Sequence, residues 1–209
     1  MMVFYRTHLF PQTERKYMAT LEQIKSLRER TGAGVVDVKK ALDEAGDDES
    51  KAIDILRLRG IAKAAKKSDR DASEGIIISY VHSNGRVGVL LKLLCETDFV
   101  ARNEEFRSLG HDIAMHIAAL HPAYTKPEEV TDEEVAKEKV FWMEEVAGKP
   151  ADLTQKIFLG KEKKFREEKA LLTQAFVKDG EKTVGALITE KIQKIGENIQ
   201  VGSFVRFEL

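Results

Sequence analysis

Residues 76–95 read IIISYVHSNGRVGVLLKLLC. Two β-branched and apolar runs, residues 76–82 and 86–95, flank the dipeptide Asn84-Gly85. Asn-Gly between two such runs is a strong hairpin signal, because both residues tolerate the positive φ angles of a tight turn. The sequence therefore predicts an antiparallel hairpin, followed by a loop over residues 96–102.

The C-terminus predicts a third strand. Apolar and small residues alternate with polar ones, which would place one set on a single face of the strand. This set is Ile199, Val201, Ser203, Val205, Phe207 and Leu209. Pairing with the hairpin would complete a three-stranded antiparallel sheet. Helical patterns that flank it run over residues 103–120, 131–147, 151–159, 161–169 and 184–195.

The N-terminal part predicts a bundle of three helices. Thr20 and Gln23 have the spacing of a capping box, which opens a helix that the glycines at 32 and 34 end. A second helix over residues 35–45 places Val35, Val38, Leu42 and Ala45 on its core face. A third begins at residue 47 or 48 and is expected to stop at Gly60.

These elements predict an α+β protein with four segments. Residues 1–17 are either a disordered tail or a leader, and residues 18–60 form the helical bundle. Residues 61–75 form a basic helical linker, and residues 76–209 form an α+β core domain with the three-stranded sheet flanked by helices.

The composition narrows the classes of function. Lys plus Arg number 34 and Asp plus Glu 35, giving a net charge of −1. Binding to nucleic acid or to a membrane surface through the overall charge of the protein is therefore not expected. The single cysteine excludes an internal disulfide and favours a reducing compartment. The sequence also contains no transmembrane segment. Because a convincing leader is also lacking, we expect a cytoplasmic protein.

Signals for catalysis are weak. The chain has neither the phosphate loop nor the dinucleotide fingerprint. His111 and His116 are five residues apart, which is off-register for two ligands on one helical face, and Cys95 is expected to be a buried, inert thiol. We therefore predict no catalytic residues, no metal site and no cofactor.

Two features suggest docking instead. Val36 lies on the polar side of its helix, where it is either a lone exposed valine, which periodicity alone favours, or the apolar tip of a binding surface. Phe99 lies in the run Thr97-Asp98-Phe99-Val100, in the loop predicted after the second strand. Its ring either tucks back onto the core, which the pattern alone favours, or projects as a plug for a partner's pocket.

Several motifs resemble those of translation elongation factor Ts. They are Thr31-Gly32-Ala33-Gly34 with the residues up to Leu42, Ala62 to Lys67, Cys95 to Arg102, Ala114 to Ala118, Gln174 to Asp179, and Ile195 to Ile199. Together they extend over residues 18–209, with only one copy of the sheet-forming unit, as in the short members of that family.

The resemblance implies a guanine-nucleotide exchange factor for elongation factor Tu, with no catalytic site of its own. It implies that the bundle resembles ubiquitin-associated domains and contacts the partner through Val35 and Val36. It also implies a second contact through Thr97, Asp98, Phe99 and Val100, in which the Phe99 ring wedges between partner helices and disturbs the magnesium and phosphate site. Short members pair as homodimers, and in one of them a cysteine near the C-terminus takes part in the pairing. This chain has Val205 in that region, so the dimer that the resemblance implies is non-covalent.

Three other functions fit parts of the sequence. The bundle alone suggests a peptide- or ubiquitin-type binding module, but this gives the loop around Phe99 no role. The basic stretch from Lys63 to Arg70 suggests RNA binding, against which the net charge argues. An enzyme would need titratable residues that converge only in three dimensions.

Overall fold

A computed structural model describes residues 19–209, so the tail or leader predicted at residues 1–17 lies outside the described part. The chain forms two compact units that divide between Arg57 and Leu58, inside one helix. The finer bounds predicted from the sequence, residues 18–60, 61–75 and 76–209, stay predictions.

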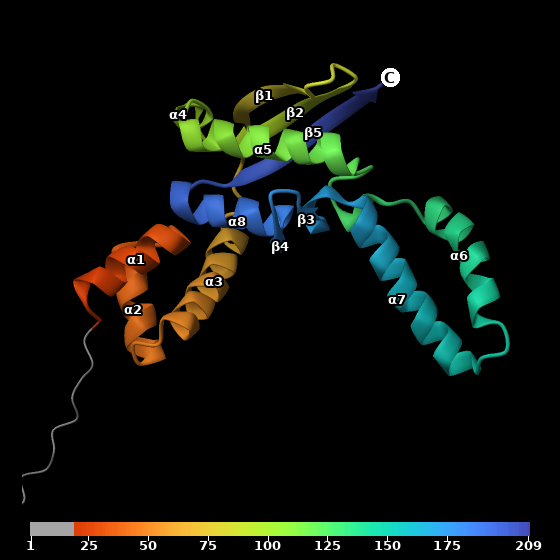
Figure 1. The fold of residues 1–209 in the computed structure, drawn as a ribbon, viewed down its shortest axis with the longest axis horizontal. Coiled ribbons are helices and arrows are strands. Elements are labelled where there is room, and N and C mark those ends of the chain that lie inside the picture. Colours follow the sequence, from red (N-terminus) through yellow and green to blue (C-terminus); the bar gives the residue numbers. More distant parts are fainter. Residues whose placement is uncertain (1–18) are drawn as a thin grey trace, which may run out of the picture. The chain divides into compact units, whose positions relative to one another are not determined.

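The first unit contains α1 (Leu21–Thr31), α2 (Val35–Ala45) and the first part of α3 (Glu49–Ala65), as Figure 1 shows. The predicted capping box is present, since Thr20 and Gln23 each accept the other's backbone N–H. Gly32 and Gly46 end the first two helices with φ angles of 66° and 63°. Apolar residues of all three helices and of the turn between the first two form the core. These are Ile24, Leu27, Ala33, Val38, Ala41, Leu42, Ala52 and Leu56.

The first residues of α1 and α2 are more exposed than helical spacing indicates. Val35 was expected on the core face of its helix, but its side chain is 48% exposed, and Leu21 at the start of α1 is exposed as well. Side chains on a helix lean toward its N-terminus, so those of a first residue extend beyond the helix end. Helical spacing alone therefore overestimates burial at these two positions.

The second unit contains the sheet and most of the helices. Its elements are β1 (Glu74–Val81), β2 (Val87–Cys95), α4 (Asp98–Ala101), α5 (Glu104–Leu120), η1 (Pro127–Glu129), α6 (Asp132–Val146), α7 (Ala151–Lys169), η2 (Leu171–Thr173), β3 (Ala175–Phe176), β4 (Asp179–Thr183), α8 (Val184–Ile195) and β5 (Ile199–Glu208). The predicted α+β class with a three-stranded antiparallel sheet is confirmed, in the order β1-β2-β5.

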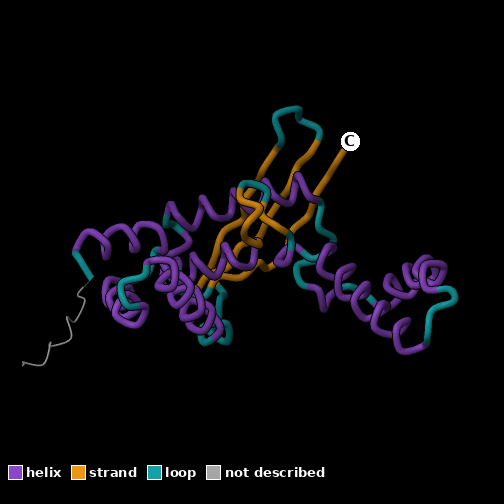
Figure 2. The backbone as a smooth tube through the Cα atoms, turned by 60° about the horizontal axis from the view of Figure 1, so that its bottom comes forward, coloured by secondary structure: helices purple, strands orange, loops and turns teal. Residues whose placement is uncertain are grey.

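The hairpin has the predicted register. Val81 pairs with Gly88 and Glu74 pairs with Cys95, so the turn is centred on Asn84-Gly85. Gly85 has a φ of 68°, which a glycine adopts at little cost. Figure 2 shows this hairpin and the C-terminal strand as one sheet. The small β3–β4 hairpin was not predicted, because its first strand has only two residues.

A β-bulge in β5 makes the predicted single face wrong. Val201 lies opposite Leu93 and Ser203 lies opposite Lys92, which leaves Gly202 as an extra residue. One inserted residue moves every later side chain to the other face of the strand. Ile199 and Val201 face the core, as does Phe204 beyond the bulge. The residues Val205, Phe207 and Leu209 are exposed.

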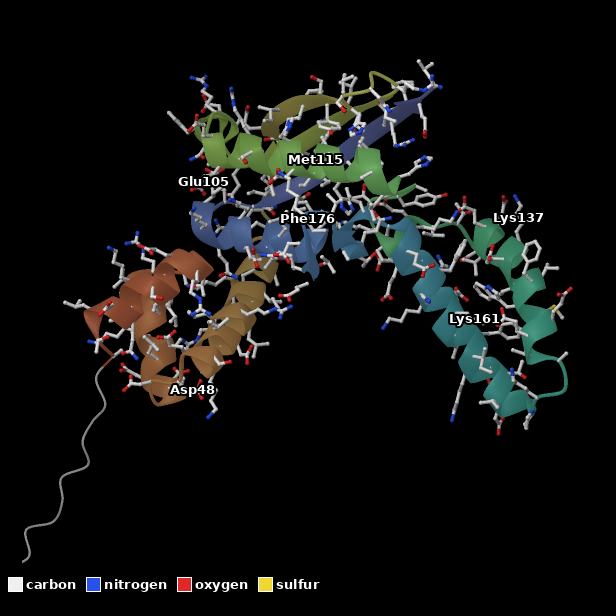
Figure 3. All side chains as sticks on the ribbon, in the orientation of Figure 1. Asp48, Glu105, Met115, Lys137, Lys161 and Phe176 are labelled. Atoms are coloured by element: carbon white, nitrogen blue, oxygen red, sulfur yellow. The ribbon has the colours of Figure 1, made fainter. Side chains whose placement is uncertain are left out.

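Helix α5 covers the inner face of the sheet (Figure 1). The apolar stripe of Phe106, Leu109, Ile113 and Ile117 on this helix is fully or almost fully buried, whereas Leu120 is exposed at the end of the helix. Helix α8 packs against the same core through Val184, Ile188 and Ile192. At the start of α5, Glu105, labelled in Figure 3, pairs with Lys194 of α8 at 2.5 Å.

Two predicted helix ends are wrong, because both glycines lie inside continuous helices. Gly60 lies within α3, where a Cβ atom would collide with the side chain of Gln193 on α8. The glycine there permits close packing, and the following Ala-rich segment continues the helix. Gly160 lies within α7, so residues 151–169 form one helix and not two.

A pair of Gly→Ala variants tests this account of the glycines. Gly75 has a φ of 151°, and a Cβ there would collide with the carbonyl oxygen of Leu93. We expect Gly75→Ala to lower the free energy of unfolding by about 2 kcal/mol or more. At Gly160, apart from its chain neighbours and the backbone of its own helix, no atom of the described residues lies within 4 Å of an added Cβ, so Gly160→Ala should raise the free energy of unfolding by about 1 kcal/mol. Urea denaturation measures both, and equal effects would contradict the account.

Candidate functional site

The segment predicted as a loop after β2 contains the short helix α4. Thr97 is its N-cap, with its hydroxyl oxygen accepting the backbone N–H of Val100 at 3.4 Å. Threonine favours this position because its side chain satisfies a backbone donor that the helix leaves unpaired. Asp98 follows in the first turn, where a negative charge is favourable.

This helical turn directs Phe99 to solvent. Its side chain is 80% exposed, whereas Ala101 is buried and Val100 packs against the core. The interpretation favoured by the pattern alone, a ring tucked back on the core, is therefore wrong. A rigidly presented aromatic is suited to insertion into a partner's pocket, since burying a Phe contributes roughly 1.5–3 kcal/mol.

Asp98 forms an ion pair beside this aromatic. One of its carboxylate oxygens lies 2.9 Å from the guanidinium of Arg102, one helical turn further on. The side chain of Arg102 is 74% exposed to solvent and that of Asp98 is 48% exposed. Such pairs contribute little to stability, so Asp98 can exchange Arg102 for a partner's cation at small cost.

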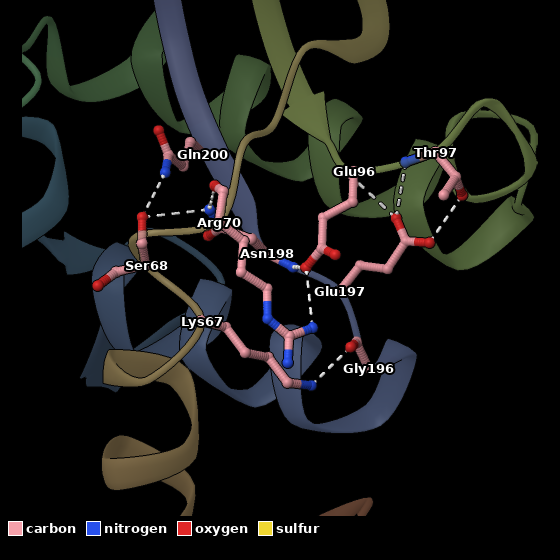
Figure 4. Close-up of polar contacts among 9 residues, drawn as sticks. All are labelled: Lys67, Ser68, Arg70, Glu96, Thr97, Gly196, Glu197, Asn198 and Gln200. Carbon is pink, nitrogen blue, oxygen red and sulfur yellow. Dashed lines mark hydrogen bonds and ion pairs between the residues drawn. The ribbon is translucent and has the colours of Figure 1, made fainter.

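Sequence analysis missed the residue that touches this segment from elsewhere in the chain. Glu197, in the turn between α8 and β5, accepts hydrogen bonds from the residues just before α4 (Figure 4). The run Ile195 to Ile199 contributed to the family resemblance, but no role followed from it. A contact between residues 97 and 197 has no signal in local periodicity.

The other two predicted site residues lie in the first unit. Val35 and Val36 are the first two residues of α2, directly after its N-cap Gly34. Val36 is 66% exposed, so both valines offer apolar surface next to a tight turn. The structure thus groups Thr97, Asp98, Phe99 and Val100 on one turn, and Val35 with Val36 on another.

Two of the groups considered for catalysis, Cys95 and His116, are buried, whereas His111 is exposed. Burial raises the pKa of the Cys95 thiol to about 11, which keeps it protonated near neutral pH. His116 is fully buried, with Nε2 3.0 Å from the Gln174 side-chain oxygen and Nδ1 accepting the Val177 backbone N–H at 3.2 Å. Over residues 19–209, no group of three or more His, Cys, Asp or Glu residues is arranged to hold a metal ion.

Over residues 19–209, no helix combines the length and the apolar character needed to cross a membrane.

Exposed apolar side chains on ordered turns are typical of proteins that bind a partner. Comparison with known proteins gives the family. The profile of the family Elongation factor TS matches residues 19–209. A relative named Elongation factor Ts from Thermosipho melanesiensis is 54% identical over 192 residues, covering 91% of this chain and 98% of the relative. Another from Thermodesulfovibrio yellowstonii is 53% identical over 191 residues, covering 91% and 96%.

A third relative of that name, from Fervidobacterium nodosum, is 52% identical over 190 residues, covering 90% of this chain and 96% of the relative. The chain therefore belongs to the elongation factor Ts family of translation factors. The family predicted from the sequence motifs is confirmed.

The buried histidine makes stability depend on pH. Burial lowers the pKa of His116 below its ordinary value of 6.5, so between these two values the unfolded chain binds more protons than the folded one. Stability should therefore fall as the pH falls through 6.5 toward the folded-state value. Urea denaturation at about pH 8 and about pH 5.5 measures this loss, and His116→Gln should remove part of it. The same pH dependence in both proteins would contradict the prediction.

Proposed function

We propose that this chain is a guanine-nucleotide exchange factor for elongation factor Tu. It binds the GDP complex, promotes release of GDP by disturbing the magnesium and phosphate site, and allows GTP to enter. The observation that carries this proposal is the exposed ring of Phe99 on the capped turn α4. Membership of the elongation factor Ts family supports the identity of the partner.

The proposed mechanism needs no catalytic group on this chain. Magnesium and backbone donors neutralise the diphosphate of GDP, so a small displacement of that site weakens nucleotide binding. Coupling between two ligands is reciprocal, so GDP weakens binding of the factor by the same ratio. The factor binds the nucleotide-free partner more tightly than the GDP-bound partner, and the contacts of the Phe99 wedge provide this difference in affinity.

Each proposed contact residue has a distinct role. Phe99 is the wedge, and Asp98 is the charged group beside it. Thr97 and Val100 hold the turn, because one caps it and the other packs on the core. Val35 and Val36 make the second contact, from the first unit.

Removal of the wedge tests the proposal. We expect Phe99→Ala to slow the stimulated release of a fluorescent GDP analogue from elongation factor Tu by about tenfold or more, because the ring no longer enters the partner. The matched control is Phe141→Ala on α6, whose ring is also largely exposed. Neither change removes a buried side chain, so both variants should remain folded.

The outcomes separate function from mechanism. Loss with Phe99→Ala and none with Phe141→Ala would support both. Acceleration that survives Phe99→Ala would overturn the wedge and keep the exchange activity. A folded chain that leaves GDP release from a competent partner unchanged would contradict the proposed function.

The proposal includes a non-covalent homodimer, in the cytoplasm. Apolar side chains remain exposed on the outer face of the sheet, opposite α5. They are Ile77, Val81, Leu90, Val205 and Phe207. Leu90 and Val205 are cross-strand neighbours, so this apolar surface is continuous across β2 and β5. A second copy that covers this face would bury it, and an apolar face of this kind favours self-association.

A charge placed on this face should dissociate the dimer. We expect wild-type chain to sediment with the mass of two chains at micromolar concentration and Val205→Lys to sediment as one, because a buried unpaired ammonium is costly. Leu159→Lys, at an exposed leucine of α7, is the control and should remain dimeric. Analytical ultracentrifugation decides, and a monomeric wild type would contradict the homodimer.

A further inference from the structure

Glu197 contacts the segment that leads into α4 with both carboxylate oxygens. One oxygen accepts the backbone N–H groups of Glu96 at 3.1 Å and Thr97 at 3.0 Å. The other accepts the hydroxyl of Thr97 at 2.7 Å. Hydrogen bonds to an ionised carboxylate are stronger than those between neutral groups. Glu197 therefore restrains the backbone and side chain of Thr97 at the same time.

The hydroxyl of Thr97 transmits this restraint to the helix. A threonine hydroxyl has one proton to donate and two lone pairs. Because its proton is donated to Glu197, a lone pair is directed to the N–H of Val100, which lies 3.4 Å away. A helix of one turn is unstable by itself, so its conformation depends on such contacts. The chain of hydrogen bonds runs from Glu197 through Thr97 to the turn that presents Phe99.

The turn that carries Glu197 is itself anchored (Figure 4). Asn198 is only 1% exposed, and its backbone N–H donates to the Glu96 side chain at 2.6 Å. Its side-chain amide donates to the carbonyl oxygens of Arg70 at 2.8 Å and Ser68 at 3.3 Å. A buried amide with several partners has little freedom to move, so the backbone on which Glu197 sits is fixed.

We propose that Glu197 is a positioning residue, which holds the turn with Phe99 in its partner-binding conformation before the partner arrives, with Asn198 as its anchor. This inference rests on the proposed function. Ordering a loop in advance removes an entropic cost from binding. Both carboxylate oxygens of Glu197 are already engaged within the chain, so the residue acts through Thr97 and not by touching elongation factor Tu.

Two substitutions at one position test the inference. Glu197→Ala removes all three acceptor contacts. Glu197→Gln can keep a hydrogen bond to each of the three groups. Its oxygen can accept both backbone N–H groups, and its amide can donate to the Thr97 hydroxyl. The first should lower hydrogen-exchange protection of the Glu96, Thr97 and Val100 amides by about tenfold or more, and the second should preserve most of it. Protection of the Ile113 amide in α5 reports whether each variant is folded.

The same variants are then assayed for stimulated GDP release. We expect Glu197→Ala to lose about tenfold in rate at limiting concentration and Glu197→Gln to remain close to wild type. Equal losses in both variants with protection of α4 intact would overturn the inference, because they would indicate a direct charge contact with the partner. Unchanged protection and rate in Glu197→Ala would overturn it as well.

Failure of the proposed function gives a different result. In that case the wild-type chain itself leaves GDP release unchanged, whatever residue occupies position 197. Hydrogen-exchange protection still tests whether Glu197 holds the turn, because this measurement needs no partner. Loss of protection in Glu197→Ala with rescue by Glu197→Gln would support the positioning role, and intact protection would overturn it.

Discussion

Pairing of β5 with β2 is the contact on which the second unit depends. It places Ile199 opposite Cys95 and Glu208 opposite Val87, although these residues lie far apart in the sequence. Closing so long a segment costs conformational entropy, which the buried apolar residues of β2, α5 and α8 must offset. The pairing also places the turn before β5 beside the loop after β2. One long-range contact thus completes the sheet and brings Glu197 to Thr97.

The candidate site depends on this frame. Phe99 is exposed, which is unfavourable in water for a ring of its size, yet the turn that carries it is capped, packed and hydrogen-bonded. A flexible loop would allow the ring to fold back on the nearby core. The restraint on Thr97 opposes this and keeps the apolar surface available. An exposed aromatic on an ordered turn departs from the usual rule of burial in the way that binding sites do.

The bulge at Gly202 has a similar consequence for the sheet. Without the extra residue, Val205 and Phe207 would share the inner face with Ile199 and Val201. With it, the first pair faces outward and Phe204 completes the core. One glycine therefore divides the apolar residues of β5 between the core and an exposed surface. Because of the bulge, β5 has apolar side chains on both of its faces, one set packed in the core and one set exposed.

The sequence by itself determined the elements whose signals are local. The Asn84-Gly85 turn set the register of the hairpin, and the predicted bounds 35–45 and 184–195 agree with α2 and α8. Caps and glycine turns act over three or four residues, so they can be found without knowledge of the fold. The six motifs along the chain likewise identified the family, because their order and spacing are specific.

Tertiary structure decided the features that depend on residues remote in the chain. It continued α3 through Gly60 against Gln193, inserted Gly202 as a bulge opposite β2, and turned Phe99 outward. It also brought Glu197 to Thr97. Periodicity describes one element at a time, whereas these features follow from packing between elements. Local patterns therefore located the candidate site, and the long-range pairing of β2 with β5 brought to it the residue that holds its shape.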